Sequence, residues 1–339
     1  MKGVIIKECS YKDCDLEVFK QENKCIFHCE KTLENGWIID PLKNGLTGDP
    51  HDKYAKYTQQ VELFWKEFVG QVSKKNVDTR GFILPYYNTR MVDFEDDIRN
   101  LDEIKFRNCV FVDQFIFESE NFENPVISFV ESSFYGELRL SLSKVKYLGL
   151  RNLKFNAPFA ISTEEDVKHI EIMAIETMHE EPLIHKVVYC SVDKLEVWHI
   201  LDSNSSIRIS NCKIGELKLS DLNISQIMLV ENIIYKIIEI VDILIFGLSL
   251  EKNTYATDTN IIFKNIHTDH LMLEENFSNT KKTRFYDIKV LQAFTCEDCD
   301  FKNVYFNDVN IELANKRIVR TTFIDAHLNS IEWGGILMR

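Results

Sequence analysis

The sequence predicts an all-β fold for residues 101–339, a right-handed parallel β-helix, with a small metal-binding and helical unit before it. One observation behind this prediction is that apolar residues recur about every five positions. Another is that a second apolar or small residue commonly stands two positions before each of them. An α-helix would require a period of 3.6 residues and a single strand a period of 2.0. A period of five with an inner spacing of two therefore indicates short strands that turn two side chains inward and end in a corner.

The period is clearest at the two ends of this region. Near the C-terminus Phe301, Phe306 and Ile311 are five apart, and each follows a companion by two positions, Cys299, Val304 and Val309. Near residue 101 the phenylalanines recur at intervals of five to seven, at Phe106, Phe111, Phe117, Phe122, Phe129 and Phe134. In the middle, apolar pairs alternate with a second set, as Ile207/Ile209, Cys212/Ile214, Leu217/Leu219, Leu222/Ile224 and Ile227/Leu229.

Repeats this short bury a core only when successive coils stack on one another. Four faces of five residues would give a coil of about twenty residues, and hence about eleven or twelve coils at the usual strand spacing. The repeat is interrupted at residues 163–166 and 251–260, which are rich in acidic and polar side chains. We expect both segments to be loops that leave the coil.

Two shorter regions precede the repeats. Residues 1–50 form a Cys/His module, which ends in a segment rich in turn-forming residues. Residues 51–100 form a helical cap or linker. Within it a helix is predicted near residues 52–75, because Tyr54, Tyr57, Val61, Phe64, Trp65, Phe68 and Val72 follow the spacing of one apolar face. We expect that face to pack against the end of the repeat region.

The Cys/His module has the spacing of a metal site. Cys9, Cys14, Cys25 and His28 supply three sulfurs and one imidazole, which can complete the tetrahedral shell of a structural zinc ion. Cys29 competes with His28 as the fourth ligand. The alternative is a cluster of free thiols in a reducing compartment. A shell made wholly of protein ligands leaves no position for a substrate, so the site is predicted to hold together a segment too small to form its own core.

Two other pairs have metal-like spacing but a simpler interpretation. Cys296 and Cys299 fall on inward positions of the five-residue repeat, so both are expected to pack in the core. His267 and His270 are three apart and have no further ligand nearby in sequence. On a strand, residues three apart point to opposite faces, which disfavours a shared metal ion.

Charge and cysteine content restrict the setting. The net charge is −13, and residues 1–100 carry 15 Lys and Arg against 17 Asp and Glu, so most of the acidic excess lies in residues 101–339. An acidic average surface argues against direct nucleic-acid binding. No export signal or membrane span is evident, and nine cysteines without an export signal suggest a reducing, cytoplasmic location.

The repeats resemble those of the bacterial pentapeptide-repeat family. Asn108-Cys109-Val110-Phe111 and Asp298-Cys299-Asp300-Phe301 fit the family's unit, in which a small residue stands two positions before a central Leu or Phe. The likeness is good over residues 101–135 and 290–330 and weaker over 140–290, where larger inward residues imply wider or less regular coils. Cys25-Ile26-Phe27-His28 also resembles a motif that ends the N-terminal cysteine module in one subgroup.

The resemblance implies one specific function. Some members of the family imitate the shape and charge of duplex DNA and occupy the DNA site of a type II topoisomerase. The acidic excess of residues 101–339 is compatible with such an acidic DNA mimic. From the residues alone, the leading expectation is a non-enzymatic scaffold that binds a protein partner along its side faces, with a homodimer through the solenoid ends as a further option.

A carbohydrate-active enzyme is the third interpretation, because some parallel β-helices cleave glycans. It requires a groove with two or three carboxylates and aromatic flanks. The adjacent acids Glu274 and Glu275, and the cluster Asp93, Glu95, Asp96 and Asp97, are typical of solvated turns instead. The sequence therefore predicts no catalytic residues and no enzymatic activity.

Overall fold

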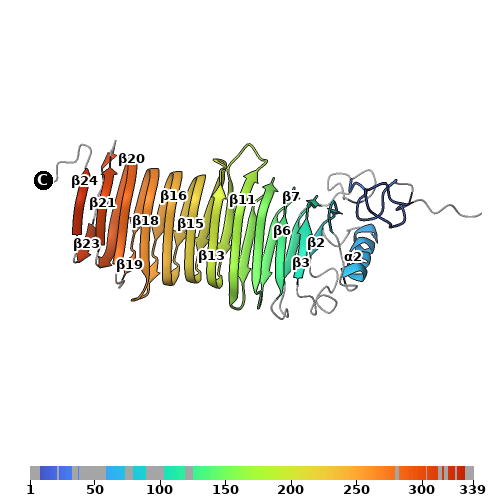
Figure 1. Ribbon diagram of the computed structural model, residues 1–339, viewed down its shortest axis with the longest axis horizontal. Coiled ribbons are helices and arrows are strands. Elements are labelled where there is room, and N and C mark those ends of the chain that lie inside the picture. The colour runs from blue at the N-terminus through green and yellow to red at the C-terminus, as the bar shows by residue number, and fades with distance from the viewer. Residues whose placement is uncertain are drawn as a thin grey trace, which may run out of the picture.

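Over the residues that the structure describes, the protein is a parallel β-solenoid with one short helix at its N-terminal end. In the computed structural model the strands lie side by side along the long axis, and helix α2 (Gln59–Val72) sits beside the first of them (Figure 1). The structure describes residues 8–20, 23–32, 37, 59–72, 79–88, 103–118, 125–278, 282–302, 304–311, 315–316, 320–324 and 327–332. No helix in these ranges is long and apolar enough to cross a membrane.

The strands all belong to one hydrogen-bonded sheet that winds along the chain. Their bounds are β1 (Ile83–Leu84), β2 (Tyr87–Asn88), β3 (Glu103–Arg107), β4 (Val110–Phe111), β5 (Phe115–Glu118), β6 (Val126–Val130), β7 (Ser133–Phe134), β8 (Leu138–Leu142), β9 (Tyr147–Phe155), β10 (Phe159–Thr163), β11 (Val167–Thr177), β12 (Leu183–Val188), β13 (Ser191–Ile200), β14 (Ser205–Ser210), β15 (Lys213–Val230), β16 (Ile233–Glu251), β17 (Thr254–Tyr255), β18 (Asn260–Glu274), β19 (Phe277–Ser278), β20 (Lys282–Lys302), β21 (Val304–Ile311), β22 (Asn315–Lys316), β23 (Arg320–Ile324) and β24 (His327–Glu332).

Each strand pairs in parallel with the strand one coil further along the chain. One ladder of paired residues runs through Phe106, Phe129, Leu150, Ile172, Val197, Leu219, Ile240, Phe263, Phe285, Phe306 and Leu328. Successive members are 21–25 residues apart, so each coil is longer than the predicted twenty residues. The number of coils is correspondingly lower than predicted. The widest step, from Ile172 to Val197, contains the connection between β11 and β12.

The predicted five-residue rhythm is confirmed within a single coil. Each of its four faces turns two buried side chains inward, and the two are separated by two positions. In one coil these pairs are Ile238/Ile240, Ile243/Ile245, Leu248/Leu250 and Asn253/Tyr255. Cys296 and Cys299 occupy the same inward positions two coils further on and are 1% and 2% exposed, as the sequence predicted.

One corner of the coil adopts left-handed backbone geometry in ten successive turns. The residue two positions after each member of the paired ladder from Phe106 to Phe306 has a φ of 50–57°. Asn and Asp tolerate this conformation better than other non-glycine residues, because their short polar side chains bond to the local backbone. The corner residues are mostly of these two types: Asn108, Glu131, Asn152, Ala174, His199, Asp221, Asp242, Asn265, Asp287 and Asp308.

A buried asparagine ladder runs up the interior of one face. Asn232, Asn253 and Asn276 are each 0% exposed. The Asn253 Oδ1 accepts hydrogen bonds from the backbone N–H and the side-chain amide of Asn232, and its own amide donates to the Leu229 carbonyl and to Asn276. Each asparagine thus satisfies backbone groups of the coil before it, which a hydrophobic core would otherwise leave without partners.

The structure corrects several expectations. Residues 251–260 are not one loop, because β17 lies within them and Asn253 and Tyr255 point into the core. Coil spacing from Val197 to Phe285 is 21–23 residues, so most of the middle is as regular as the ends. Parallel pairing starts at β1 and β2, before residue 101. Residues 163–166 are also not a loop that leaves the coil, because Thr163 is a buried residue of β10 and only residues 164–166 connect β10 to β11. Phe122, Tyr54, Tyr57, residues 41–50 and the acids at 93 and 95–97 lie outside the described residues.

Helix α2 covers the N-terminal end of the solenoid. Its described apolar face consists of Val61, Phe64, Trp65, Phe68 and Val69, all buried. The Trp65 indole N–H donates to the Tyr86 carbonyl at 2.9 Å, and its ring packs on Tyr87. A helix on the open end of a solenoid shields an otherwise unpaired sheet edge.

Candidate metal centre

The N-terminal cysteines lie on a small hairpin. Glu8 and Glu17 form an antiparallel bridge, and the Cys9 N–H donates to the Leu16 carbonyl at 2.9 Å. The turn at its tip is closed by the Cys14 N–H, which donates to the Tyr11 carbonyl, and Asp13 has a φ of 63°. This turn folds Cys14 back toward Cys9, so two sulfurs face the same side.

The other two potential ligands come from a single tight turn. The N–H groups of His28 and Cys29 both donate to the Cys25 carbonyl, at 3.1 and 2.9 Å. The turn places the Cys25 sulfur and the His28 ring on one side, with the Cys25 Sγ 3.1 Å from the His28 Nδ1. Its Phe27 carbonyl accepts from the Ile83 N–H of β1 at 2.8 Å, which attaches the turn directly to the first coil.

The structure brings together all four residues that the sequence selected. The ligand atoms of Cys9, Cys14, Cys25 and His28 lie within 4.8 Å of one another, close enough to hold a metal ion. The Cys14 and Cys25 sulfurs are 3.8 Å apart, and the Cys9 sulfur is 3.7 Å from the His28 Nδ1. Among the described residues, no other group of three or more His, Cys, Asp and Glu side chains has its ligand atoms this close together.

The electrostatics of the site favour the thiolate form of Cys9 and oppose that of Cys14 and Cys25. Burial raises the pKa of Cys9, but N–H groups from Cys25 and Tyr11 point at its sulfur, and the net pKa is lowered. Burial raises the pKa of Cys14. The pKa of Cys25 rises to about 12, through burial and the neighbouring sulfurs of Cys14 and Cys9. A divalent cation among the sulfurs would reverse this, because it stabilises every thiolate that it binds.

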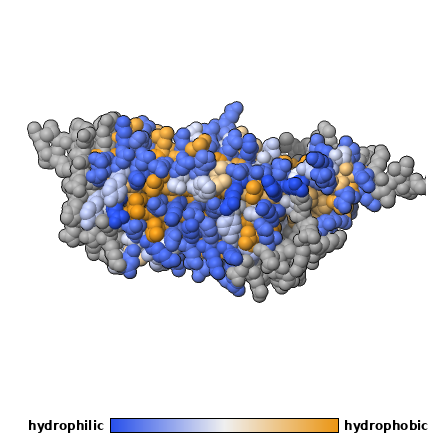
Figure 2. Space-filling view, viewed as in Figure 1, coloured by the Kyte–Doolittle hydropathy of each residue, from blue (hydrophilic) through white to orange (hydrophobic). Residues whose placement is uncertain are grey.

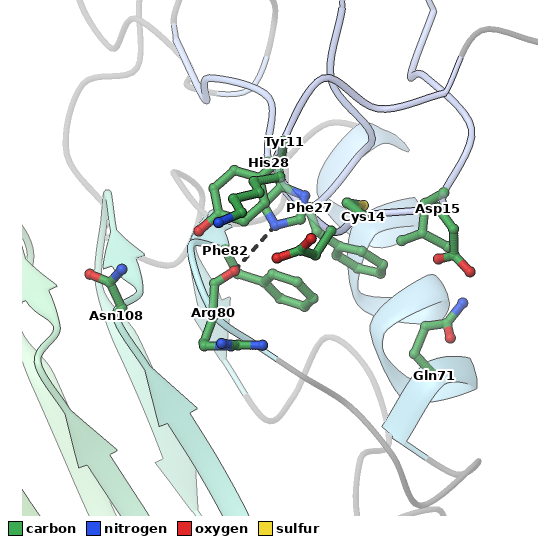
Figure 3. Close-up of a pocket in the computed structure, with 12 residues that line it drawn as sticks. Tyr11, Cys14, Asp15, Phe27, His28, Gln71, Arg80, Phe82 and Asn108 are labelled. Atoms are coloured by element: carbon green, nitrogen blue, oxygen red, sulfur yellow. Dashed lines mark hydrogen bonds between the residues drawn. The ribbon is translucent and has the colours of Figure 1, made fainter.

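The His28 ring is fixed by partners on both sides. Its Nε2 lies 3.2 Å from the Arg80 carbonyl (Figure 3). Because a carbonyl oxygen only accepts hydrogen bonds, Nε2 carries the proton and donates it. The Nδ1 of the neutral ring is then free of a proton and can bind a metal ion. The Tyr11 ring stacks on it at 3.9 Å with an interplanar angle of 7°. Gly81, with a φ of 76°, leaves room for Tyr11, since an added Cβ would meet the tyrosine oxygen at 2.1 Å. Such an outer partner orients metal-binding histidines in general.

Cys29 has a different environment from the four clustered residues. Its thiol points to the Ile26 carbonyl, and the buried ammonium of Lys31 lies 3.3 Å from its sulfur. Lys31 also donates to the carbonyls of Ile26 and Cys29 and lies 4.5 Å from the centre of the Trp37 ring. Of the two competing fourth ligands, His28 therefore belongs to the cluster and Cys29 does not.

A cavity of about 430 Å³ lies beside the cluster. Its walls come from the hairpin, the ligand turn, α2 and the first coils, including Tyr11, His28, Gln71, Arg80 and Asn108 (Figure 3). The cavity therefore lies where the N-terminal module meets the first coils.

The remaining candidates from the sequence do not assemble into a site within the described residues. His267 is exposed and His270 packs against Phe246, with ring centres 4.8 Å apart. Glu275 lies at a corner with a φ of 48° and pairs with Lys252. None of the nine cysteines, all of which are described, forms a disulfide.

Comparison with known protein families, curated proteins and solved structures finds no match for this chain.

Sequence reasoning missed one polar cluster on the outer surface, which centres on Glu171 and Trp198. Its members come from coils 20–27 residues apart, and at outward positions of a strand they resemble ordinary solvated residues. The signal that was available is Gly149, a glycine in the interior of a strand, which often marks a close approach by another group.

Proposed function

We propose that the protein is a non-enzymatic scaffold that binds a protein partner through the side of its solenoid. The observation that supports this is a set of large apolar side chains exposed on one side of alternate coils. Leu244 and Phe246 are 53% and 49% exposed on one coil, and Leu201 and Leu291 are 61% and 40% exposed two coils before and two coils after it. Hydrophobic side chains reach the surface of the rod between hydrophilic ones (Figure 2). Large apolar side chains that gather at the surface of a folded protein can mark an interaction site, and Leu244 and Phe246 form the centre of this one.

A partner capture with matched variants tests this proposal. The double variant Leu244→Glu with Phe246→Glu places charges in the apolar patch, and Lys264→Glu is the control at an exposed polar position. Affinity purification from the native host, quantified by mass spectrometry, should recover a specific partner with the parent chain and the control. Recovery should fall at least about tenfold with the double variant. Equal recovery by all three chains would contradict the proposal.

We also propose that the Cys/His cluster binds one structural zinc ion. Bonds of about 2.3 Å to sulfur and about 2.0 Å to nitrogen place two tetrahedral sulfur ligands about 3.8 Å apart, and a sulfur and a nitrogen about 3.5 Å apart. The separations of 3.8 Å between Cys14 and Cys25 and 3.7 Å between Cys9 and His28 fit these values. Three sulfurs and an imidazole favour zinc over magnesium or calcium.

Elemental analysis of the purified chain tests the zinc proposal. We expect about one zinc per chain, and a much lower content in Cys25→Ser. Cys29→Ser is the matched control, because its sulfur lies outside the cluster, and it should retain the metal. A zinc content far below one equivalent in the parent chain would contradict the proposal.

Mimicry of DNA is less well supported than scaffolding. Many acids of the side faces are paired with basic residues one coil away, which breaks up a continuous negative stripe; examples are Arg107–Glu131, Lys154–Glu176 and Lys218–Glu239. The acids at the left-handed corner have a conformational reason to be there. Inhibition of DNA supercoiling by gyrase is the direct assay, and mimicry requires inhibition at micromolar protein.

A further inference from the structure

A small polar depression lies on the outer surface where β9, β11, β13 and β15 pair. It is about 230 Å³ in volume and is lined by Glu171, Glu196, Trp198, Lys218 and Ser220. The lining belongs to two neighbouring rows of outward positions. One row runs Gly149, Glu171, Glu196, Lys218, and the other runs Arg151, Met173, Trp198, Ser220.

Glu171 organises the cluster from a nearly buried position. Only 7% of the residue is exposed, although it lies on the outside of the coil. Its carboxylate accepts hydrogen bonds from the Tyr147 hydroxyl, from the Arg151 guanidinium and from the Trp198 indole N–H, the last at 3.1 Å. Burial raises the pKa of Glu171, but these donors outweigh it and the net pKa is lowered. Glu171 is thus held as an anion that orients two aromatic rings.

The rings of Tyr147 and Trp198 differ in their environment. An added Cβ on Gly149 would meet the Tyr147 ring at 2.7 Å, so the glycine lets this ring lie flat over the sheet and reach Glu171. Trp198 is 38% exposed, and its N–H edge is fixed by the hydrogen bond to Glu171. A fixed, partly exposed indole beside a depression is a platform for stacking.

The charges around the platform are balanced. Glu171 is paired with Arg151, and Glu196 accepts from His169 at 2.9 Å and from Lys194 at 2.8 Å. A cationic partner would therefore gain little from either carboxylate. What remains at the surface is a mixture of acceptors on Glu196, donors on Lys218 and the Ser220 hydroxyl, next to an apolar ring face. This combination suits a ligand that has many hydroxyl groups and an apolar face.

From this geometry we infer that the depression around Trp198 binds a pyranose unit of a neutral glycan. The C–H face of the sugar stacks on the indole, and its hydroxyls bond to Glu196, Lys218 and Ser220. Coils succeed one another at about 4.8 Å, which is close to the length of one sugar ring. A glycan chain can therefore extend along the rows.

Glu171 is not suited to be the acid of a glycosidase, so we infer binding at this site. A glycosidase needs one carboxyl group that is protonated to act as an acid. The carboxylate of Glu171 is instead fully occupied by donors that stabilise its charged form. This inference is independent of the scaffold proposal, which concerns the patch around Leu244 and Phe246.

Titration of the full chain with defined oligosaccharides tests the inference. The probes are cellohexaose, mannohexaose, chitohexaose and maltohexaose, followed by tryptophan fluorescence and calorimetry up to about 10 mM. At least one should bind saturably. Trp198→Ala should weaken that binding at least tenfold, and Lys218→Glu, on the rim, should weaken it severalfold without removing an aromatic ring.

Tyr189→Ala is the matched control, because Tyr189 is an aromatic residue that is 69% exposed outside the depression. It should bind like the parent chain. Circular dichroism establishes whether each variant is folded. If Trp198→Ala does not fold, the binding of Lys218→Glu tests the inference instead. The inference is overturned if none of the four hexaoses binds to the parent chain. It is equally overturned if a folded variant of Trp198 or Lys218 binds as tightly as the parent.

Discussion

At the scale of single residues, the interior of the solenoid tolerates a few polar side chains in defined environments. His185 is one of them, 1% exposed and stacked on Phe159 at 4.3 Å. Its Nδ1 accepts from the Phe159 N–H, and its Nε2 has no hydrogen-bond partner within the described part of the chain. Burial lowers the pKa of His185 to about 3, and only Asp202 acts in the opposite direction. The residue is therefore neutral in the folded protein.

His185 should make the protein sensitive to acid. Its pKa is about 3 when folded and near 6.5 when unfolded, so the unfolded state binds more protons between these values and stability falls as pH falls. The loss at pH 4.5 is about 2–3 kcal/mol, at 1.36 kcal/mol per pKa unit. His185→Leu should reduce the difference in unfolding free energy between pH 7 and pH 4.5, measured by denaturant titration. An unchanged difference would show that His185 does not carry the effect.

At the scale of the element, each strand is held by its inward pair and by the corner that follows it. The asparagine ladder is the polar version of this arrangement. Asn253 bonds to Asn232 on one side and to Asn276 on the other, and it also satisfies the Leu229 carbonyl. Because the bonds connect successive coils, the ladder fixes their register as well as their stability.

Removal of one rung should be costly. Asn253→Ala leaves the backbone N–H of Asn232 and the carbonyl of Leu229 buried without these partners. The expected loss is about 2–6 kcal/mol of unfolding free energy, at roughly 1–3 kcal/mol for each of the two unsatisfied buried groups. Asn223→Ala, at an exposed position of β15, should change it by less than about 0.5 kcal/mol. Thermal or denaturant unfolding measures both, and equal losses would argue against the ladder.

The element scale also shows what the sequence could predict. Inward positions were predictable, because burial imposes an apolar rhythm of five, and Cys299 and Ile214 followed it. The length of a coil could not be predicted. The residues beyond twenty lie at corners and connections, where no inward side chain marks them in the sequence. β1 and β2 were missed because each has two residues and a proline stands between them, so only pairing with β4 and β5 defines them.

At the scale of the whole molecule, the N-terminal module and the solenoid form a continuous structure. The four clustered ligands were predictable, since they lie close together in sequence with the spacing of a metal site. The attachment of these residues to the solenoid could not be predicted, because the hydrogen-bond partner of His28 is the Arg80 carbonyl, 52 residues away in sequence. The ligand turn joins the first coil through Phe27 and Ile83, and α2 covers the same end. The metal binding that we propose at this cluster would thus be coupled to capping of the sheet edge.

Hydrogen–deuterium exchange before and after metal chelation measures this coupling most directly. Removal of the metal should speed amide exchange in residues 83–88 by at least about tenfold, because the ligand turn no longer holds β1 against β4. Exchange in residues 217–250, several coils away, should stay the same. Unchanged protection of residues 83–88 in a chain shown to have lost its metal would contradict the account that the module caps the solenoid through a metal-dependent contact.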